Sequence, residues 1–238
     1  MEFKTRKELV TFLKRLKYFN EGAQGKCYFD RSTNMVYKIF FSFIDEEPSF
    51  INREDIMYFS HLQNDTVIWP TDVIYVGQEI VGYTVRYVNA FNLETMDPLS
   101  VNLESLERAV VKAQKDIYFL TESSVILYDV LYNILFDYKN LFIIDTMDYG
   151  NGKVSEEANM RGINLAIKYF LVSGFFDAFV DRNETLRELY RGKCNALEFL
   201  KYFKSELESH LKKEIITLND AKPLVRRRPN KDYIRQIR

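Results

Sequence analysis

The spacing of apolar residues changes once along the chain, near residue 90, and this change constrains the fold more than any other feature. Before it, β-branched and aromatic residues cluster in runs of strand length, with polar turns between them. After it, most apolar residues recur three and four positions apart, which is the spacing of an amphipathic helix. Strands followed by helices predict an α+β protein with a β-rich N-terminal lobe and a helical C-terminal lobe.

The same spacing predicts the individual elements. In the N-terminal lobe we expect a helix over 4–18, a hairpin over 27–43, a helix over 52–63, and two strands over 67–76 and 79–88. In the C-terminal lobe we expect a helix over 103–120, short strands over 125–128, 133–136 and 141–145, and helices from 155 to 218. The predicted domains are therefore an N-terminal lobe at 1–88, a reduced C-terminal lobe at 89–222 and a basic tail at 223–238, with a cleft near residues 87–92.

Composition and charge exclude several classes of protein. With 238 residues, 47% of them hydrophobic, the chain is long enough to bury a proper core. The net charge of −1 gives no overall attraction to nucleic acid or to an anionic membrane, so we expect neither as a partner. The two cysteines, Cys27 and Cys194, form no CxxC pair, which indicates a reducing compartment instead of a disulfide scaffold or a zinc site.

The N-terminal segment is expected to be neither a signal peptide nor a membrane-spanning helix. The first nineteen residues alternate basic and apolar side chains, and every apolar run is too short to cross a bilayer, so we expect a soluble cytoplasmic protein. The basic tail contains Arg226–Arg228. It is interpreted either as a solvated terminus or as a segment that binds an acidic partner.

Polar side chains interrupt the apolar run VILYDVLYNILFD and follow the next strand. Asp129 and Asn133 lie between short apolar strands, and Asp145 comes directly after Leu141–Ile144. Burial of such oxygen-bearing groups without partners is costly, whereas Mg²⁺ prefers carboxylate and amide oxygens as ligands. The pattern favours a metal and phosphate site; the alternative is that all three are turn residues.

Three further signals lie in the N-terminal lobe. A turn with two glycines, Gly22 and Gly25, precedes a strand, and such a turn allows backbone N–H groups to approach phosphate oxygens. Lys38 lies inside a strand and shares a face with Val36, and Glu54 is early enough in its helix to pair with Lys38. The alternatives are an ordinary turn, an edge-strand lysine and a surface carboxylate near a helix N-terminus.

In this order the signals resemble the protein-kinase-like superfamily over about residues 17–150. The resemblance implies a two-lobed kinase-like fold that binds ATP and Mg²⁺. It assigns the glycine-rich loop to Gly22, Ala23, Gln24, Gly25 and Cys27, the strand lysine to Lys38, the helix glutamate to Glu54 and the hinge to Arg86, Tyr87 and Val88. It assigns Asp129 to the catalytic loop as the catalytic residue, and it assigns Asn133 and Asp145 as the metal ligands.

The sequence also departs from the family pattern. Leu127-Tyr128-Asp129 replaces H-R-D, so the arginine that couples to a phosphorylated activation loop is missing, and Asp129 and Asn133 are four positions apart where the family has five. Asp145-Thr146-Met147 replaces D-F-G, with Asp148 as a neighbour that could substitute for Asp145 or assist it, and no A-P-E triplet follows.

Together these features predict an ATP- and Mg²⁺-dependent phosphotransferase, a divergent protein Ser/Thr kinase with a protein substrate or partner. Two alternatives stay open. The altered loop around Asp129 favours a pseudokinase that acts as a binding or scaffold module, and the reduced C-terminal lobe favours a small-molecule kinase.

Overall fold

The computed structural model describes residues 1–45, 52–192 and 194–225, and the chain divides into two compact units. The N-terminal unit contains Met1–Asn89 together with Asp145–Gly150. The C-terminal unit contains Ala90–Ile144 and the chain from Asn151 onward. From the sequence we expected the division after residue 88, with all of 145–150 in the C-terminal lobe. Arg226–Arg228 of the predicted basic tail lie outside the described residues.

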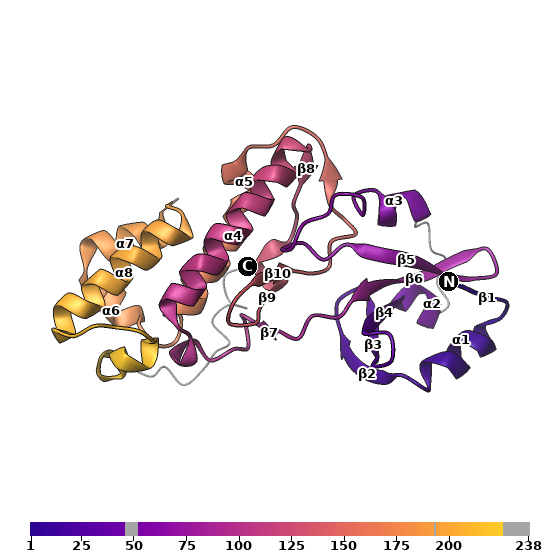
Figure 1. Ribbon diagram of the computed structural model, residues 1–238, viewed down its shortest axis with the longest axis horizontal. Helices are drawn as coiled ribbons and strands as arrows, with labels where there is room; N and C mark the ends of the chain where they lie inside the picture. Colours follow the sequence, from indigo (N-terminus) through magenta and orange to yellow (C-terminus); the bar gives the residue numbers. More distant parts are fainter. Residues whose placement is uncertain (46–51, 193, 226–238) are drawn as a thin grey trace. The chain divides into compact units, whose positions relative to one another are not determined.

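The N-terminal unit is built on a six-stranded sheet with strand order β1-β5-β6-β4-β3-β2 (Figure 1). Its strands are β1 (Glu2–Phe3), β2 (Lys17–Glu21), β3 (Gly25–Asp30), β4 (Met35–Phe40), β5 (Pro70–Val76) and β6 (Glu79–Arg86). Its helices are α1 (Arg6–Leu13), α2 (Phe41–Ile44) and α3 (Arg53–Met57). Neighbouring strands are antiparallel except for β1, which runs parallel to β5.

The two faces of this sheet have separate cores because side chains alternate along each strand. Tyr37 and Ile39 of β4 pack on one face with Leu9 and Leu13 of α1. On the other face, Phe40 packs with a group that includes residues of β5, β6 and α3, namely Ile56, Val73 and Tyr83. Lys38 lies between Tyr37 and Ile39 in the sequence and therefore shares the face of Phe40.

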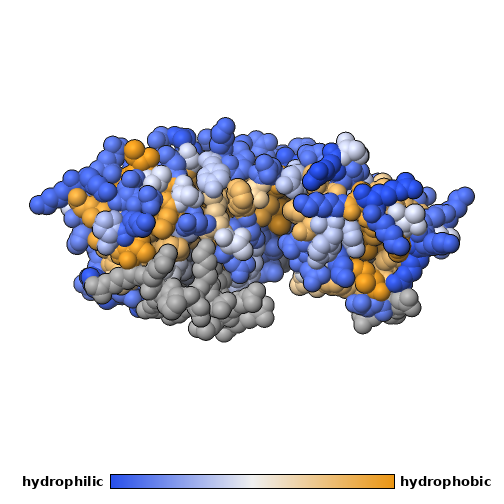
Figure 2. Space-filling view, turned by 90° about the horizontal axis from the view of Figure 1, so that it is seen from below, coloured by the Kyte–Doolittle hydropathy of each residue, from blue (hydrophilic) through white to orange (hydrophobic). Residues whose placement is uncertain are grey.

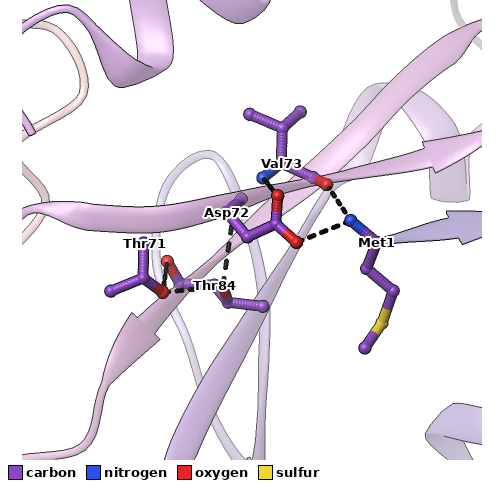
Figure 3. Close-up of polar contacts among 5 residues, drawn as sticks. All are labelled: Met1, Thr71, Asp72, Val73 and Thr84. Atoms are coloured by element: carbon purple, nitrogen blue, oxygen red, sulfur yellow. Dashed lines mark hydrogen bonds and ion pairs between the residues drawn. The ribbon is translucent and has the colours of Figure 1, made fainter.

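The short strand β1 is fixed to β5 by polar contacts at the chain start (Figure 3). The ammonium of Met1 donates to Asp72 Oδ2 at 2.6 Å and to the carbonyl of Val73 at 2.8 Å. Next to them the hydroxyls of Thr71 and Thr84 lie 2.8 Å apart and join β5 to β6. The Met1 contacts thus hold β1 at one edge of the sheet.

Two of the predicted helices are shorter than expected. The helix expected over 4–18 begins after the N-cap Thr5 and ends at Leu13, because residues from Lys17 onward pair with β3 as strand β2. The helix expected over 52–63 ends at Met57. Beyond it the N–H groups of Ser60 and Leu62 donate to carbonyls three residues back, and the Ser60 hydroxyl also donates to the Met57 carbonyl, so turns replace the helix.

The C-terminal unit is mainly helical, as the sequence indicates. Its α-helices are α4 (Leu103–Glu122), α5 (Glu156–Val172), α6 (Asp177–Arg182), α7 (Glu184–Arg191) and α8 (Ala196–Leu211). The short strands are β7 (Phe91–Asn92), β8 (Val125–Ile126), β9 (Ile134–Phe136), β10 (Leu141–Ile143) and, at the junction of the units, β11 (Gly150–Asn151). Three 3₁₀ turns complete it: η1 (Pro98–Ser100), η2 (Val130–Tyr132) and η3 (Leu218–Leu224).

Helix α4 forms the centre of this unit and packs against α5 and α8. Its apolar stripe is buried because Leu106, Val110, Ala113 and Ile117 recur at helical spacing. On the face shown in Figure 2, hydrophilic residues cover much of the surface, and apolar patches appear among these hydrophilic residues. Among the described residues, no helix combines the length and the apolar character needed to span a membrane.

Candidate functional site

The centre of the candidate site is Lys38, whose side chain is only 8% exposed. Strand register places Cys27 of β3 directly opposite Lys38 on one side and Tyr83 of β6 opposite it on the other. Residues directly opposite each other in antiparallel strands point to the same face of the sheet. The three strands therefore present a thiol, an ammonium and a phenol in one row.

Lys38 forms an ion pair with Asp145. The Lys38 ammonium also donates to Oε1 of Gln24 at 3.0 Å, and it lies 5.6 Å from the ring centroid of Tyr83. The Tyr83 hydroxyl donates to the same Asp145 oxygen at 3.1 Å. A cation and a carboxylate predicted as site residues, far apart in the sequence, thus meet within the N-terminal unit.

The segment that carries Asp145 is anchored to this unit on its C-terminal side. The Thr146 hydroxyl, which is buried, donates to the carbonyl of Ile68 at 3.0 Å. The ring of Tyr149 packs edge-on against Trp69, with centroids 5.9 Å apart. Asp145 itself has a left-handed backbone with φ of 62°, a conformation that costs free energy for a non-glycine residue and is common at functional sites.

The predicted glycine-rich loop is the turn of the β2–β3 hairpin. The Gly22 N–H donates to the Gly25 carbonyl at 3.0 Å, and the Phe41 N–H donates to the Gln24 carbonyl at 2.9 Å. A Cβ atom on Gly25 would lie 2.2 Å from the Ile39 carbonyl oxygen, so this close approach of two strands requires glycine. At Gly22 a Cβ would meet nothing within 4 Å, so only Gly25 is required by packing.

The loop also reaches the segment after Asp145. Nε2 of Gln24 donates to Oδ2 of Asp148 at 2.6 Å, so the Gln24 amide connects the Lys38 ammonium with a second carboxylate. Asp148 is exposed, whereas Lys38 is buried. From the sequence, Asp148 is a neighbour of Asp145 that could substitute for it or assist it; its distance from Lys38 depends on the fold.

The low solvent access of this row changes the acidity of two of its groups. Burial raises the pKa of Tyr83 well above its usual value near 10, and the adjacent Asp145 carboxylate raises it further. Burial raises the pKa of the Cys27 thiol, although the Lys38 ammonium acts in the opposite direction. Both groups are therefore neutral at pH 7, and Tyr83 acts as a hydrogen-bond donor to the carboxylate.

The C-terminal unit contains the predicted catalytic loop. Asp129 is exposed and has a left-handed backbone with φ of 49°. Its carbonyl accepts a hydrogen bond from the Asn133 side-chain amide at 2.9 Å, and the Asn133 carbonyl accepts the N–H of Ile144 at 3.0 Å. The loop thus carries Asp129 on its surface and joins Asn133 to the end of β10.

Two residues of α5 that were not predicted from the sequence support this loop. Asn159 is 2% exposed, accepts the N–H of Leu127 at 3.0 Å and donates to the Val125 carbonyl at 2.8 Å. Gly162 packs closely against Val130. A Cβ atom on Gly162 would lie 2.9 Å from the Val130 side chain, so a larger residue would crowd Val130. Asn159 is four positions before Ile163 and lies on the buried face of the helix, which is the signal that could have identified it.

Other predicted site residues lie elsewhere. Glu54 is exposed in the first turn of α3, and within the described chain the acceptors of the Lys38 ammonium are Asp145 and Gln24, not Glu54. Arg86 ends β6 and donates to the Asp65 carbonyl at 3.1 Å. The Tyr87 N–H donates to the Asn34 carbonyl at 3.0 Å, and its ring packs 4.3 Å from that of Phe29. Val88 is half-buried, and Ala23 is exposed at the tip of the glycine turn.

The described residues contain no group of three or more His, Cys, Asp or Glu side chains that could bind a metal ion. The predicted ligands Asn133 and Asp145 belong to different units. A scan of protein-family models finds no match to the chain, and a search of curated proteins finds none either. The likeness to protein kinases therefore rests on the order of the motifs.

Proposed function

We propose that the chain is an ATP- and Mg²⁺-dependent phosphotransferase with a two-lobed kinase-like fold, which transfers phosphate to protein Ser or Thr side chains. The observation that carries this proposal is the ion pair between Lys38 and Asp145 beside the glycine turn. Burial of a charged group is costly unless it is paired, and Asp145 pairs with Lys38 beside a turn that suits a phosphate group.

The residues of the N-terminal unit fit the chemistry of a nucleotide triphosphate. Lys38 supplies a cation for the α- and β-phosphates, and Gly22, where a Cβ atom would meet nothing within 4 Å, leaves one backbone position of the turn without a side chain. Arg86–Val88 and Cys27 are assigned to the adenine end. Asp145 would supply a carboxylate oxygen of the kind that Mg²⁺ prefers, and the second ligand predicted from the sequence, the amide oxygen of Asn133, belongs to the other unit.

Asp129 has the role of orienting the acceptor hydroxyl and accepting its proton. Its exposed side chain suits a protein acceptor. Bound Mg²⁺ and ATP supply the phosphoryl group and neutralise its charge. Since phosphoryl transfer depends mainly on placement and electrostatics, the missing family residues should lower the rate of transfer without abolishing it.

A pseudokinase that binds nucleotide without transferring phosphate is the second candidate. It is favoured by the exposed position of Glu54, since the lysine–glutamate pair of active protein kinases is not formed among the described residues. Nucleotide binding without transfer would distinguish this module from an enzyme.

The experiment is transfer of labelled γ-phosphate from ATP to the chain itself and to a generic protein acceptor. We expect incorporation by the wild type and a loss of about a hundredfold or more in Asp129→Asn and Asp145→Asn. Asp181→Asn is the matched control, because Asp181 is a carboxylate that pairs with Arg191 on the helical surface. Equal incorporation in all variants would contradict the assigned roles.

A further inference from the structure

The amide of Gln24 occupies one of the hydrogen-bonding positions of the Lys38 ammonium. An ammonium has three donors, and Asp145 and Gln24 take two of them. Because the Lys38 side chain is only 8% exposed, solvent has little access to the third. The lysine is therefore nearly satisfied by protein groups alone.

Gln24 is held from both ends of its amide. Oε1 accepts from Lys38 at 3.0 Å and Nε2 donates to Asp148 at 2.6 Å. Both hydrogen bonds involve a charged partner, and such bonds are stronger than bonds between neutral groups. The glutamine thus fastens the turn of the β2–β3 hairpin to the segment that follows Asp145.

We propose that Gln24 is a gating residue of the phosphate site: its amide closes the glycine turn over Lys38, and a phosphate group must displace it to reach the ammonium. This inference rests on the proposed nucleotide-binding function. A phosphate oxygen carries a negative charge, so it is a better acceptor for the ammonium than a neutral amide oxygen. Release of Gln24 also frees the Asp148 carboxylate from its partner.

The hairpin has room for such a displacement. A side chain at Gly22 would meet nothing within 4 Å, so open space adjoins the turn, and the exposed Ala23 and Asp148 lie at the solvent side of the bridge. The bridge must break before phosphate binds, so the apparent affinity is lower than the affinity of the open form. Removal of the bridge therefore strengthens binding.

The test compares ATP affinity of Gln24→Ala, Asp148→Ala and the double variant by calorimetry, without Mg²⁺ so that carboxylate–metal contacts do not contribute. We expect Gln24→Ala to bind about three- to tenfold more tightly than the wild type, and Asp148→Ala to gain less, because it leaves the hydrogen bond between Gln24 and Lys38 in place. In the Gln24→Ala background, Asp148→Ala should add less than it does in the wild type, because the bridge is already removed. Gln63→Ala is the matched control, since Gln63 is an exposed glutamine of the same unit whose side-chain amide donates to the Ser60 carbonyl, away from Lys38. Its affinity should equal that of the wild type.

Amide hydrogen exchange of residues 22–25 in the nucleotide-free protein tests the bridge without any ligand, and we expect faster exchange in Gln24→Ala than in the wild type. Equal or weaker ATP binding by Gln24→Ala, or unchanged exchange, would overturn the gate while the wild type still binds nucleotide. If neither the wild type nor any variant binds ATP, the proposed function fails and the gate fails with it.

Discussion

The Lys38 ammonium and the Asp145 carboxylate form an ion pair although the two residues are 107 positions apart in the chain. Lys38 is on the central strand β4, and Asp145 follows a strand of the other unit but is packed into the N-terminal unit with residues 145–150. The pair joins two motifs that were selected separately from the sequence. The chemistry proposed for the site depends on this contact.

This ion pair should contribute to the stability of the N-terminal unit. We expect Asp145→Asn to lower the free energy of unfolding by about 1–3 kcal/mol, because it leaves a buried ammonium without its counter-ion. In the Asp145→Asn background, Lys38→Met should cost less than it does in the wild type. Urea unfolding of the four proteins measures the coupling.

The control for this cycle is the pair of Arg108 and Glu104 on α4, whose side chains are 63% and 72% exposed. An exposed pair of this kind contributes at most about 0.5 kcal/mol, so Glu104→Gln should unfold almost like the wild type. Additive effects of the Lys38 and Asp145 substitutions would show that the two charges do not interact.

Tyr83 should resist ionisation and should make the fold sensitive to alkali. Because its pKa is raised by burial and by Asp145, the folded protein keeps the phenolic proton at pH values where the unfolded chain loses it. The stabilisation is complete below about pH 10, the pKa of an unperturbed tyrosine, and declines as the pH rises further.

Tyr83→Phe removes this effect together with the hydrogen bond to Asp145. We expect the variant to be less stable at pH 7 by about 1–2 kcal/mol, with a difference that shrinks above pH 10. Tyrosine absorbance during an alkaline titration, compared between the wild type and the variant, follows the group directly. The absorbance change that the wild type shows and Tyr83→Phe lacks belongs to Tyr83. If that change occurred near pH 10, it would be inconsistent with the burial of Tyr83.

Cys27 offers a chemical probe of the row beside Lys38. Since burial raises the pKa of its thiol, we expect slow alkylation by iodoacetamide at pH 7 and faster reaction as the pH rises. If the adenine end of a nucleotide covers this position, ATP should slow the reaction of Cys27 several-fold. Mass spectrometry of the modified peptides measures both rates.

Cys194 is the internal reference for that experiment, because it belongs to the C-terminal unit and its sulfur contacts the Leu189 carbonyl. ATP should leave its reaction rate unchanged. Protection of both thiols to the same degree would indicate a general tightening of the fold, and protection of neither would remove Cys27 from the binding site.

Asn159 should govern the loop that carries Asp129. Asn159→Ala leaves the Leu127 N–H and the Val125 carbonyl without their buried partner, so we expect a loss of about 2–4 kcal/mol in stability. For the proposed phosphotransferase activity we expect a larger fall in kcat than in nucleotide affinity. The exposed Glu157 of the same helix provides the control substitution Glu157→Gln, which should change neither quantity.

Much of the N-terminal sheet could be predicted from the sequence, because β3, β4, β5 and β6 carry runs of β-branched and aromatic residues. The glycine turn and Lys38 could be located because they precede and interrupt these recognisable strands. The partner of Lys38 could not, since the side chains that meet at a site depend on strand register and on long-range packing. Glu54 was assigned by its place in a helix that ends at Met57, whereas Tyr83 was missed because only the β4–β6 register brings it opposite Lys38.

Equilibrium binding of a non-hydrolysable ATP analogue with Mg²⁺ tests the central claim most directly. By isothermal titration calorimetry we expect one saturable site in the wild type and at least about a tenfold loss of affinity in Lys38→Met, a factor that corresponds to about 1.4 kcal/mol. The far-UV circular dichroism of the variant should match that of the wild type. Equal affinity in the two proteins, or no binding by the wild type at millimolar analogue, would contradict a nucleotide site built on Lys38 and Asp145.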